Sequence, residues 1–192
     1  MSRAVARDRR IPGDAYYTPP ALAEHLVGLL GPWGGRVVLE PSAGGGAFVR
    51  ALLAAGTEVV FTNDINPDAP GQALVAPTHR RTKDFLDLAR IDVWCGGPPD
   101  WIVGNPPFRV WREHVEHALT IAPRVAFLLR LAALESRARY DFWQRTPARR
   151  VWVLSERPSF TGGGNDNAAY GFFVWERGWA GTTELSVASW RA

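Results

Sequence analysis

Short apolar runs alternate with amphipathic stretches along this chain, a pattern typical of an α/β protein. Runs rich in β-branched and aromatic residues predict strands at 36–40, 58–62, 101–104, 124–131, 151–154, 170–176 and 184–190. Apolar residues at helical spacing predict helices at 21–30, 47–55, 109–121 and 135–144, and Thr18 can cap the first of these helices. Residues 66–83 are rich in proline, so we expect an irregular segment there and a further strand ending near Asp84.

The order of these elements predicts one mostly parallel sheet. Strands that alternate with helices form parallel pairs through right-handed crossovers, which place helices on both faces of the sheet. The last strands follow each other without a helix, so we expect an antiparallel hairpin at one edge. The result is an α/β fold with a sheet of seven or slightly more strands. We find no internal repeat and expect a single domain over 16–192.

Composition excludes several classes of protein. No apolar run approaches the roughly 18 residues of a membrane span. The only cysteine, Cys95, excludes an internal disulfide, and no residues have the spacing of metal ligands. The basic residues 1–15 lack the apolar core of a secretion signal, so we expect a flexible arm and a cytoplasmic protein. This arm is either a solvated end or a phosphate-binding segment.

Charge permits a nucleic-acid partner without requiring one. The formal net charge is +3, the isoelectric point is about 9.5, and Lys83 is the only lysine among the basic residues. Arginines recur along residues 137–150, where they form either a solvated face or a nucleic-acid track. Residues 158–169 are polar and glycine-rich, which is typical of a mobile loop.

Two segments carry candidate chemistry at strand ends. Pro106 and Pro107 must stop the strand before them, which places Asn105 and Phe108 at the carboxyl edge of the sheet, where α/β folds bind ligands. Alternatively, this segment is only a strand-stopping turn with a packed phenylalanine.

The second segment is a glycine-rich turn that follows Glu40. Gly44, Gly45 and Gly46 lead into a helix, and Asp64 ends the next strand about 20 residues later, which suits a ribose-binding carboxylate. A carboxylate at Glu40 fits poorly beside a diphosphate. It suits S-adenosylmethionine, which carries an ammonium group, a sulfonium and a ribose. The other reading is a simple tight turn.

Three segments together resemble the class I S-adenosylmethionine-dependent methyltransferases of the N6-adenine type. Glu40 to Phe48 (EPSAGGGAF) is similar to their cofactor loop, and Asn105 to Phe108 (NPPF) is similar to their catalytic motif. Residues 17–19 (YTP) resemble the segment that precedes the loop. Asp64 and residues 84–85 stand where the family contacts ribose and adenine, although a helix cap with a core phenylalanine is the alternative for 84–85.

The resemblance implies a Rossmann-like class I methyltransferase fold and a set of roles. Its cofactor is S-adenosyl-L-methionine, and no metal is implied. The implied catalytic residues are Asn105, Pro106, Pro107 and Phe108. The implied cofactor-binding residues are Tyr17, Thr18, Glu40, Pro41, Ser42, Ala43, Gly44, Gly46, Phe48, Asp64, Ile65, Asp84, Phe85 and Asn105. The implied substrate-binding residues are Phe108, Arg109, Phe160 and Asn165.

The implied acceptor is the N6 amine of adenine, with DNA as the expected polymer. The lone pair of this amine is delocalised, and two acceptors aimed at its hydrogens, the Asn105 oxygen and the Pro106 carbonyl, would release it. The same motif serves RNA adenine or a glutamine amide, and a non-catalytic cofactor-binding module is a further alternative. We expect no separate target-recognition domain, so recognition would fall to residues 66–83, 109–112 and 159–169.

Overall fold

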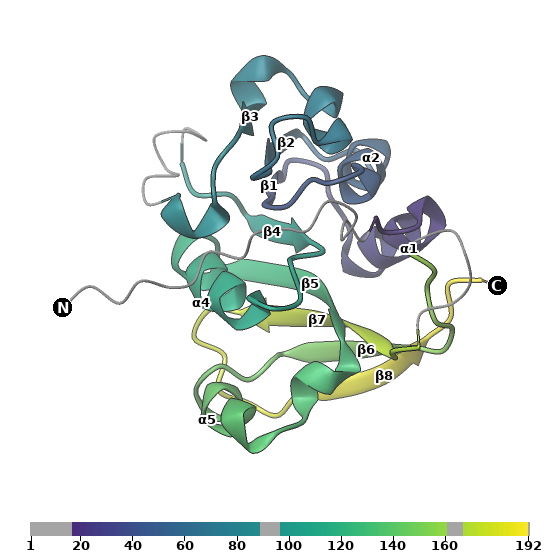
Figure 1. The fold of residues 1–192 in the computed structure, drawn as a ribbon, viewed down its shortest axis with the longest axis vertical. Coiled ribbons are helices and arrows are strands. Elements are labelled where there is room, and N and C mark those ends of the chain that lie inside the picture. The colour runs from purple at the N-terminus through teal and green to yellow at the C-terminus, as the bar shows by residue number, and fades with distance from the viewer. Residues whose placement is uncertain (1–16, 89–96, 161–166, 192) are drawn as a thin grey trace.

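The computed structural model describes residues 17–88, 97–160 and 167–191, which form one eight-stranded sheet with helices on both faces (Figure 1). The predicted arm at 1–15, Cys95 and Asn165 lie outside the described residues. The strands are β1 Val37–Glu40, β2 Val59–Asn63, β3 Arg80–Arg81, β4 Trp101–Gly104, β5 Arg124–Arg130, β6 Arg150–Leu154, β7 Tyr170–Glu176 and β8 Glu184–Ala188. The α-helices are α1 Pro20–Leu30, α2 Ala47–Ala54, α4 Trp111–Ile121 and α5 Arg137–Arg145.

The strand order is β3-β2-β1-β4-β5-β7-β6-β8, from top to bottom in Figure 1. Strands β3, β2, β1, β4 and β5 pair in parallel, which confirms the predicted mostly parallel sheet. β7 is antiparallel to both β5 and β6, because no helix separates β6 from β7 in the described part of the chain. This pair lies one strand inside the sheet, since β8 forms the edge and pairs in parallel with β6.

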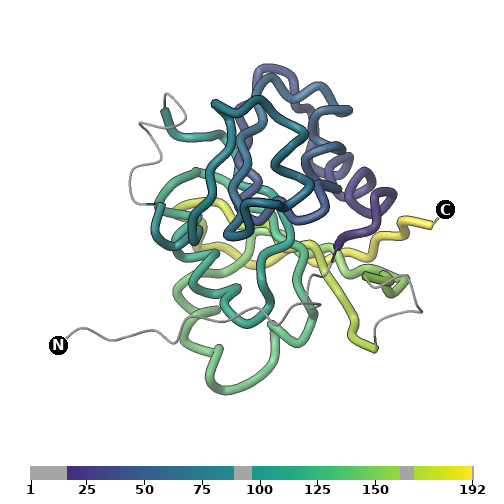
Figure 2. Tube along the Cα trace, turned by 45° about the horizontal axis from the view of Figure 1, so that its top comes forward, coloured from purple at the N-terminus to yellow at the C-terminus, as the bar shows by residue number. Residues whose placement is uncertain are grey.

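Alternating side chains of the strands build two separate cores, one on each face. On β5, Ala126 and Leu128 join the core beneath α1 and α2, whereas Phe127 and Leu129 join the core beneath α4 and α5. Figures 1 and 2 both place α1 and α2 side by side. Because β5 is buried on both faces, its sequence is a continuous apolar run.

Three predicted boundaries need correction. Residues 66–83 are not wholly irregular, since they contain the 3₁₀ turns η1 Pro70–Leu74 and η2 Pro77–His79 and end in β3. The strand expected near Asp84 therefore ends at Arg81, and Asp84 instead begins the 3₁₀ turn η3 Phe85–Asp87. Helix α4 begins at Trp111 rather than at 109, because a turn closed by the Val110 N–H and the Pro107 carbonyl (3.2 Å) precedes it.

The glycine-rich turn between β1 and α2 is packed against η1. Gly46 has a φ of 81°, a conformation that favours glycine, and caps the start of α2. Gly71 donates its N–H to the Gly44 carbonyl at 2.8 Å. A Cβ atom on Gly71 would lie 2.5 Å from the Ala43 oxygen and 2.9 Å from the Gly46 Cα, so the two segments can only meet through glycine.

We therefore predict that Gly71→Ala lowers the free energy of unfolding by about 1–3 kcal/mol, because backbone atoms on both sides must move. Gly28→Ala is the matched control, since Gly28 lies within α1 and a Cβ there meets nothing within 4 Å. That substitution should stabilise the protein by roughly 0.5–1 kcal/mol. Chemical denaturation of both variants measures the difference, and equal stabilities would contradict the proposed packing.

Candidate functional site

The carboxyl ends of β1, β2 and β4 bring the predicted site residues together. Glu40 ends β1, Asp64 follows β2 and Asn105 follows β4, and these parallel neighbours end at the same edge of the sheet. A small pocket at this edge is lined by Tyr17, Thr18, Glu40, Ser42, Ala43, Gly44, Gly45, Gly46, Ala47, Phe48 and Asn105. Most residues of the predicted cofactor site thus share one cavity.

Glu40 places a carboxyl group inside the molecule. Its side chain is 2% exposed, and Oε1 accepts the Ser42 N–H at 2.9 Å. Burial raises the pKa of Glu40 to about 8, against the lowering effect of the Ser42 hydrogen bond, and the charge of Asp64 raises it further. A Cβ on Gly104 would overlap the Glu40 carboxyl group, so a side chain at the end of β4 would displace that group.

Asp64 orders the glycine-rich turn by accepting hydrogen bonds from backbone groups. Its carboxylate is 1% exposed; Oδ2 accepts the Gly44 N–H at 2.8 Å and Oδ1 accepts the Asn66 N–H at 2.8 Å. In this arrangement Asp64 binds backbone groups of the chain itself and does not line the pocket. Ile65, the next residue, is 50% exposed and projects apolar surface at the same strand end.

Asn63 is a structural residue of the site that the sequence did not single out. Its Nδ2 donates to the Pro41 carbonyl (3.1 Å) and to the Lys83 carbonyl (3.0 Å), while Oδ1 accepts the Lys83 N–H (3.2 Å). This buried amide therefore joins the cofactor turn to the segment before Asp84. The sequence offered one indication of this role, which is that an asparagine ends an otherwise apolar strand.

Asn105 is joined to the segment before α1. Its Nδ2 donates to Thr18 Oγ1 at 3.2 Å, which directs the amide oxygen to the other side. The sequence indicated Thr18 as a possible helix cap, but Pro19 is the N-cap residue and no side chain caps α1. Thr18 is instead buried, and its hydroxyl is a hydrogen-bond partner of Asn105.

Phe108 lies in an aromatic cluster that faces α1 and α2. Its ring centroid is 6.4 Å from that of Phe160 and 5.7 Å from that of Tyr170, and the Arg130 Cζ lies over the ring at 5.0 Å. Phe160 was predicted to lie here. Arg130 and Tyr170 were missed, although an arginine directly after five buried residues of β5 is an unusual place for a charge.

Several predicted residues have other surroundings. Asp84 Oδ1 accepts the Leu86 N–H at 3.0 Å, and Phe85 is buried against α4, which is the alternative of a cap with a core phenylalanine. Phe85 packs on His114, and burial lowers the pKa of that histidine to about 4. The Phe48 ring packs into the core near Phe172 (6.2 Å).

The remaining predicted residues of the catalytic motif flank Asn105. Pro106 is buried, Pro107 is half-buried, and Arg109 is exposed just before α4.

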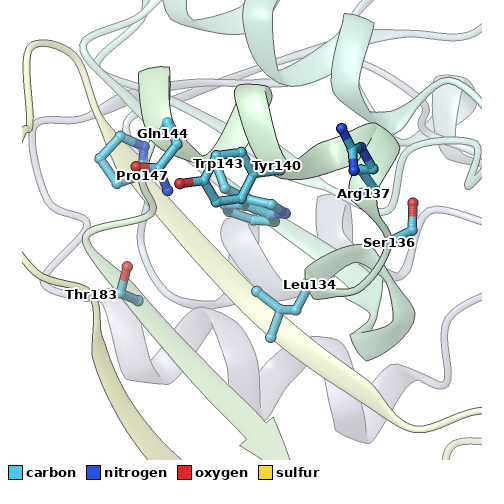
Figure 3. Close-up of a pocket in the computed structure, with 8 residues that line it drawn as sticks. All are labelled: Leu134, Ser136, Arg137, Tyr140, Trp143, Gln144, Pro147 and Thr183. Carbon is cyan, nitrogen blue, oxygen red and sulfur yellow. The ribbon is translucent and has the colours of Figure 1, made fainter.

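A larger cavity of about 550 Å³ lies elsewhere, between α5 and the segment before β8 (Figure 3). Trp143 and Tyr140 of α5 line it together with Thr183. None of the predicted site residues lies there. The pocket beside Glu40 is much smaller, about 30 Å³, because the Tyr17 ring lies against the turn, within 3.1 Å of the place where a Gly45 Cβ would be. We assign the chemistry to the smaller pocket because its walls hold the carboxylate and the amide.

Two other types of site are absent from the part of the chain that the structure describes. No three side chains of His, Cys, Asp or Glu gather as metal ligands in residues 17–88, 97–160 and 167–191. Within the same ranges no helix has the length and apolar character needed to cross a membrane.

Comparisons with known proteins agree with this geometry. No family model matches the chain. The type II methyltransferase M.TthHB8I of Thermus thermophilus is 32% identical over 148 residues, which are 72% of this chain and 31% of that protein. M.HincII of Haemophilus influenzae, also a type II methyltransferase, is 26% identical over 98 residues, 51% of this chain and 18% of that protein. The chain thus spans less than a third of the length of these relatives.

Solved structures define the fold. The M protein of the type I restriction enzyme EcoKI superposes with a TM-score of 0.66 at 13% identity, over 91% of this chain and 48% of that one. A protein from Pyrococcus horikoshii proposed to be an RNA methyltransferase gives a TM-score of 0.69 at 15% identity, over 89% of this chain and 91% of that one.

The chain therefore has the Rossmann-like class I methyltransferase fold, as predicted. Within that class, the relatives that it matches by sequence are type II methyltransferases.

The titration of Glu40 gives a prediction for stability. Because its folded-state pKa is about 8 against an ordinary value of 4.5, the folded protein retains a proton that the unfolded chain has lost between these values. The free energy of unfolding should therefore fall by roughly a few kcal/mol as pH rises from 5 to 8.

Glu40→Gln should remove most of that fall, whereas Glu58→Gln, at an exposed glutamate, should leave it in place. Denaturation at both pH values measures the slopes, and a Glu40→Gln slope equal to that of the wild type would refute the assignment.

Proposed function

We propose that this chain transfers a methyl group from S-adenosylmethionine to the N6 amine of adenine in DNA. The observation that carries the proposal is the shared pocket: the buried Glu40, the glycine-rich turn and Asn105 all lie at the carboxyl edge of a class I methyltransferase sheet. This edge is where α/β sheets bind ligands.

The residues present fit the proposed cofactor. A buried carboxyl group with a raised pKa is costly to ionise alone, but a neighbouring ammonium group favours its ionised form. Glu40 would hold that ammonium group. The glycines of the turn have no side chains that would keep the cofactor from its backbone, and Asp64 fixes the turn at Gly44. Ile65 offers apolar surface for the adenine ring. When bound, S-adenosylmethionine supplies an electrophilic methyl group.

The acceptor would be held by the segment after β4. The Asn105 amide oxygen and the Pro106 carbonyl would accept the two hydrogens of the exocyclic amine and so free its lone pair for attack on the methyl carbon. As the new nitrogen–carbon bond forms, the methyl–sulfur bond would break to leave a neutral thioether, and the amine would lose one proton to solvent. Phe108 stacks on the base, and Thr18 holds the amide of Asn105 in one orientation through its 3.2 Å hydrogen bond. A base in duplex DNA must first flip out of its stack, at a cost of a few kcal/mol.

Two observations support DNA as the polymer. The sequence relatives are type II methyltransferases, and one structural neighbour is the M protein of a type I restriction enzyme. The net charge of +3 favours a polyanion. Recognition of the polymer would use residues 66–83 and the segment just before α4, where Arg109 is exposed.

The test is methyl transfer from labelled S-adenosylmethionine to DNA, RNA and protein. We expect label in DNA, recovered as N6-methyladenine after digestion to nucleosides. Asn105→Ala should lower kcat by at least ~100-fold, as the loss of one preorganised polar contact does in other enzymes, with cofactor binding nearly unchanged.

Asn105→Asp retains an oxygen acceptor and should keep part of the activity. Gln144→Ala, an amide on α5 outside the site, should keep all of it. Label confined to RNA or to glutamine would replace DNA as the acceptor, and full activity in Asn105→Ala would disprove the role of Asn105.

A further inference from the structure

We propose that Arg130 is a positioning residue that holds the ring of Phe108 as the stacking surface for the acceptor. The inference rests on the proposed function and extends it to a residue outside the Asn-Pro-Pro-Phe segment. It assigns a task to the charge at the end of β5.

The sheet fixes where Arg130 points. β5 and β7 are antiparallel with Arg130 opposite Tyr170, so both side chains emerge on the same face as Leu128 and Phe172. The Arg130 Nε donates to the Tyr170 hydroxyl at 3.2 Å. Because Tyr170 is only 1% exposed, its hydroxyl is a fixed anchor for the guanidinium group.

The guanidinium group in turn holds Phe108. Its Cζ lies 5.0 Å from the centre of the Phe108 ring, close enough for attraction between the cation and the ring face. Phe160 meets the same ring at an interplanar angle of 74° and Tyr170 meets it at 51°. Arg130 lies over the Phe108 ring and so restrains the plane against which the acceptor would stack.

The orientation of this ring matters because Phe108 follows Asn105 by three residues. A base stacked on Phe108 presents its amine to Asn105 only if the ring plane is fixed, and displacements of about 1 Å can cost a hundredfold in rate. A second arginine of the same strand provides a matched comparison. Arg124, at the opposite end of β5, lies over the Trp101 ring at 5.5 Å and is remote from the pocket.

The experiment compares Arg130→Met, Arg130→Lys and Arg124→Met in the full chain. We expect Arg130→Met to lower kcat about tenfold or more on the acceptor that the wild type labels, while the Kd for S-adenosylmethionine changes less than twofold. Arg130→Lys should recover part of the loss, since it keeps a cation over the ring. Arg124→Met should keep the wild-type kcat. Equal kcat in Arg130→Met and Arg124→Met would overturn the inference.

A second measurement separates this inference from the proposed function. Melting temperatures of Arg130→Met, Phe108→Leu and the double variant report their coupling in the free protein, whichever polymer is methylated. We expect the two losses to be less than additive. Additive losses would overturn the inference even if the wild type methylates DNA, whereas coupled losses in a chain that methylates nothing would overturn the proposed function alone.

Discussion

The carboxyl group of Glu40 has to be accommodated inside the molecule at the point where β1 and β4 end, and much of the surrounding structure follows from this constraint. A buried carboxylate is unfavourable unless it is hydrogen-bonded or paired with a cation. Here the Ser42 N–H supplies one hydrogen bond, and Gly104 leaves the space that the side chain occupies. The remaining cost appears as the raised pKa of Glu40. A cation bound in this pocket would favour the ionised form of the Glu40 carboxyl group and would lower its pKa.

The turn that borders Glu40 is held in shape by hydrogen bonds with residues outside the turn. Asp64 accepts the Gly44 N–H, Asn63 donates to the Pro41 carbonyl, and Gly71 donates to the Gly44 carbonyl. All three partners come from β2 or from the segment after it. The conformation of the glycine-rich turn is therefore fixed by the end of a neighbouring strand, which satisfies its backbone groups.

The sequence predicted the parallel half of the sheet and the gathering of Glu40, Asp64 and Asn105 at its carboxyl edge, for a physical reason. Glu40, Asp64 and Asn105 stand at or directly after the ends of their strands, so they must lie at one edge once the strands are parallel. The contacts between side chains within the pocket were harder to predict from the sequence. Thr18 looked like a helix cap because its position before a helix fits that role, yet its hydroxyl binds Asn105, which is 87 residues away. Asn63 and Gly71 form hydrogen bonds with backbone groups of another segment, and no local sequence pattern predicts such contacts.

The contacts of Arg130 and Tyr170 with Phe108 escaped prediction because they depend on the antiparallel insertion of β7. Tyr170 comes to lie beside Arg130 only because β7 runs between β5 and β6, a register that hydrophobic patterning does not specify. Without Tyr170 as a neighbour, the sequence shows Arg130 only as a charged residue at the end of a buried strand and does not indicate where its side chain points. With Tyr170 beside it, the guanidinium group lies over the Phe108 ring. The ring belongs to a motif that can be recognised in the sequence, whereas the residues that contact it here cannot. The parallel strands thus bring the residues of the proposed cofactor pocket together, and β7 places Tyr170 beside Arg130 and Phe108.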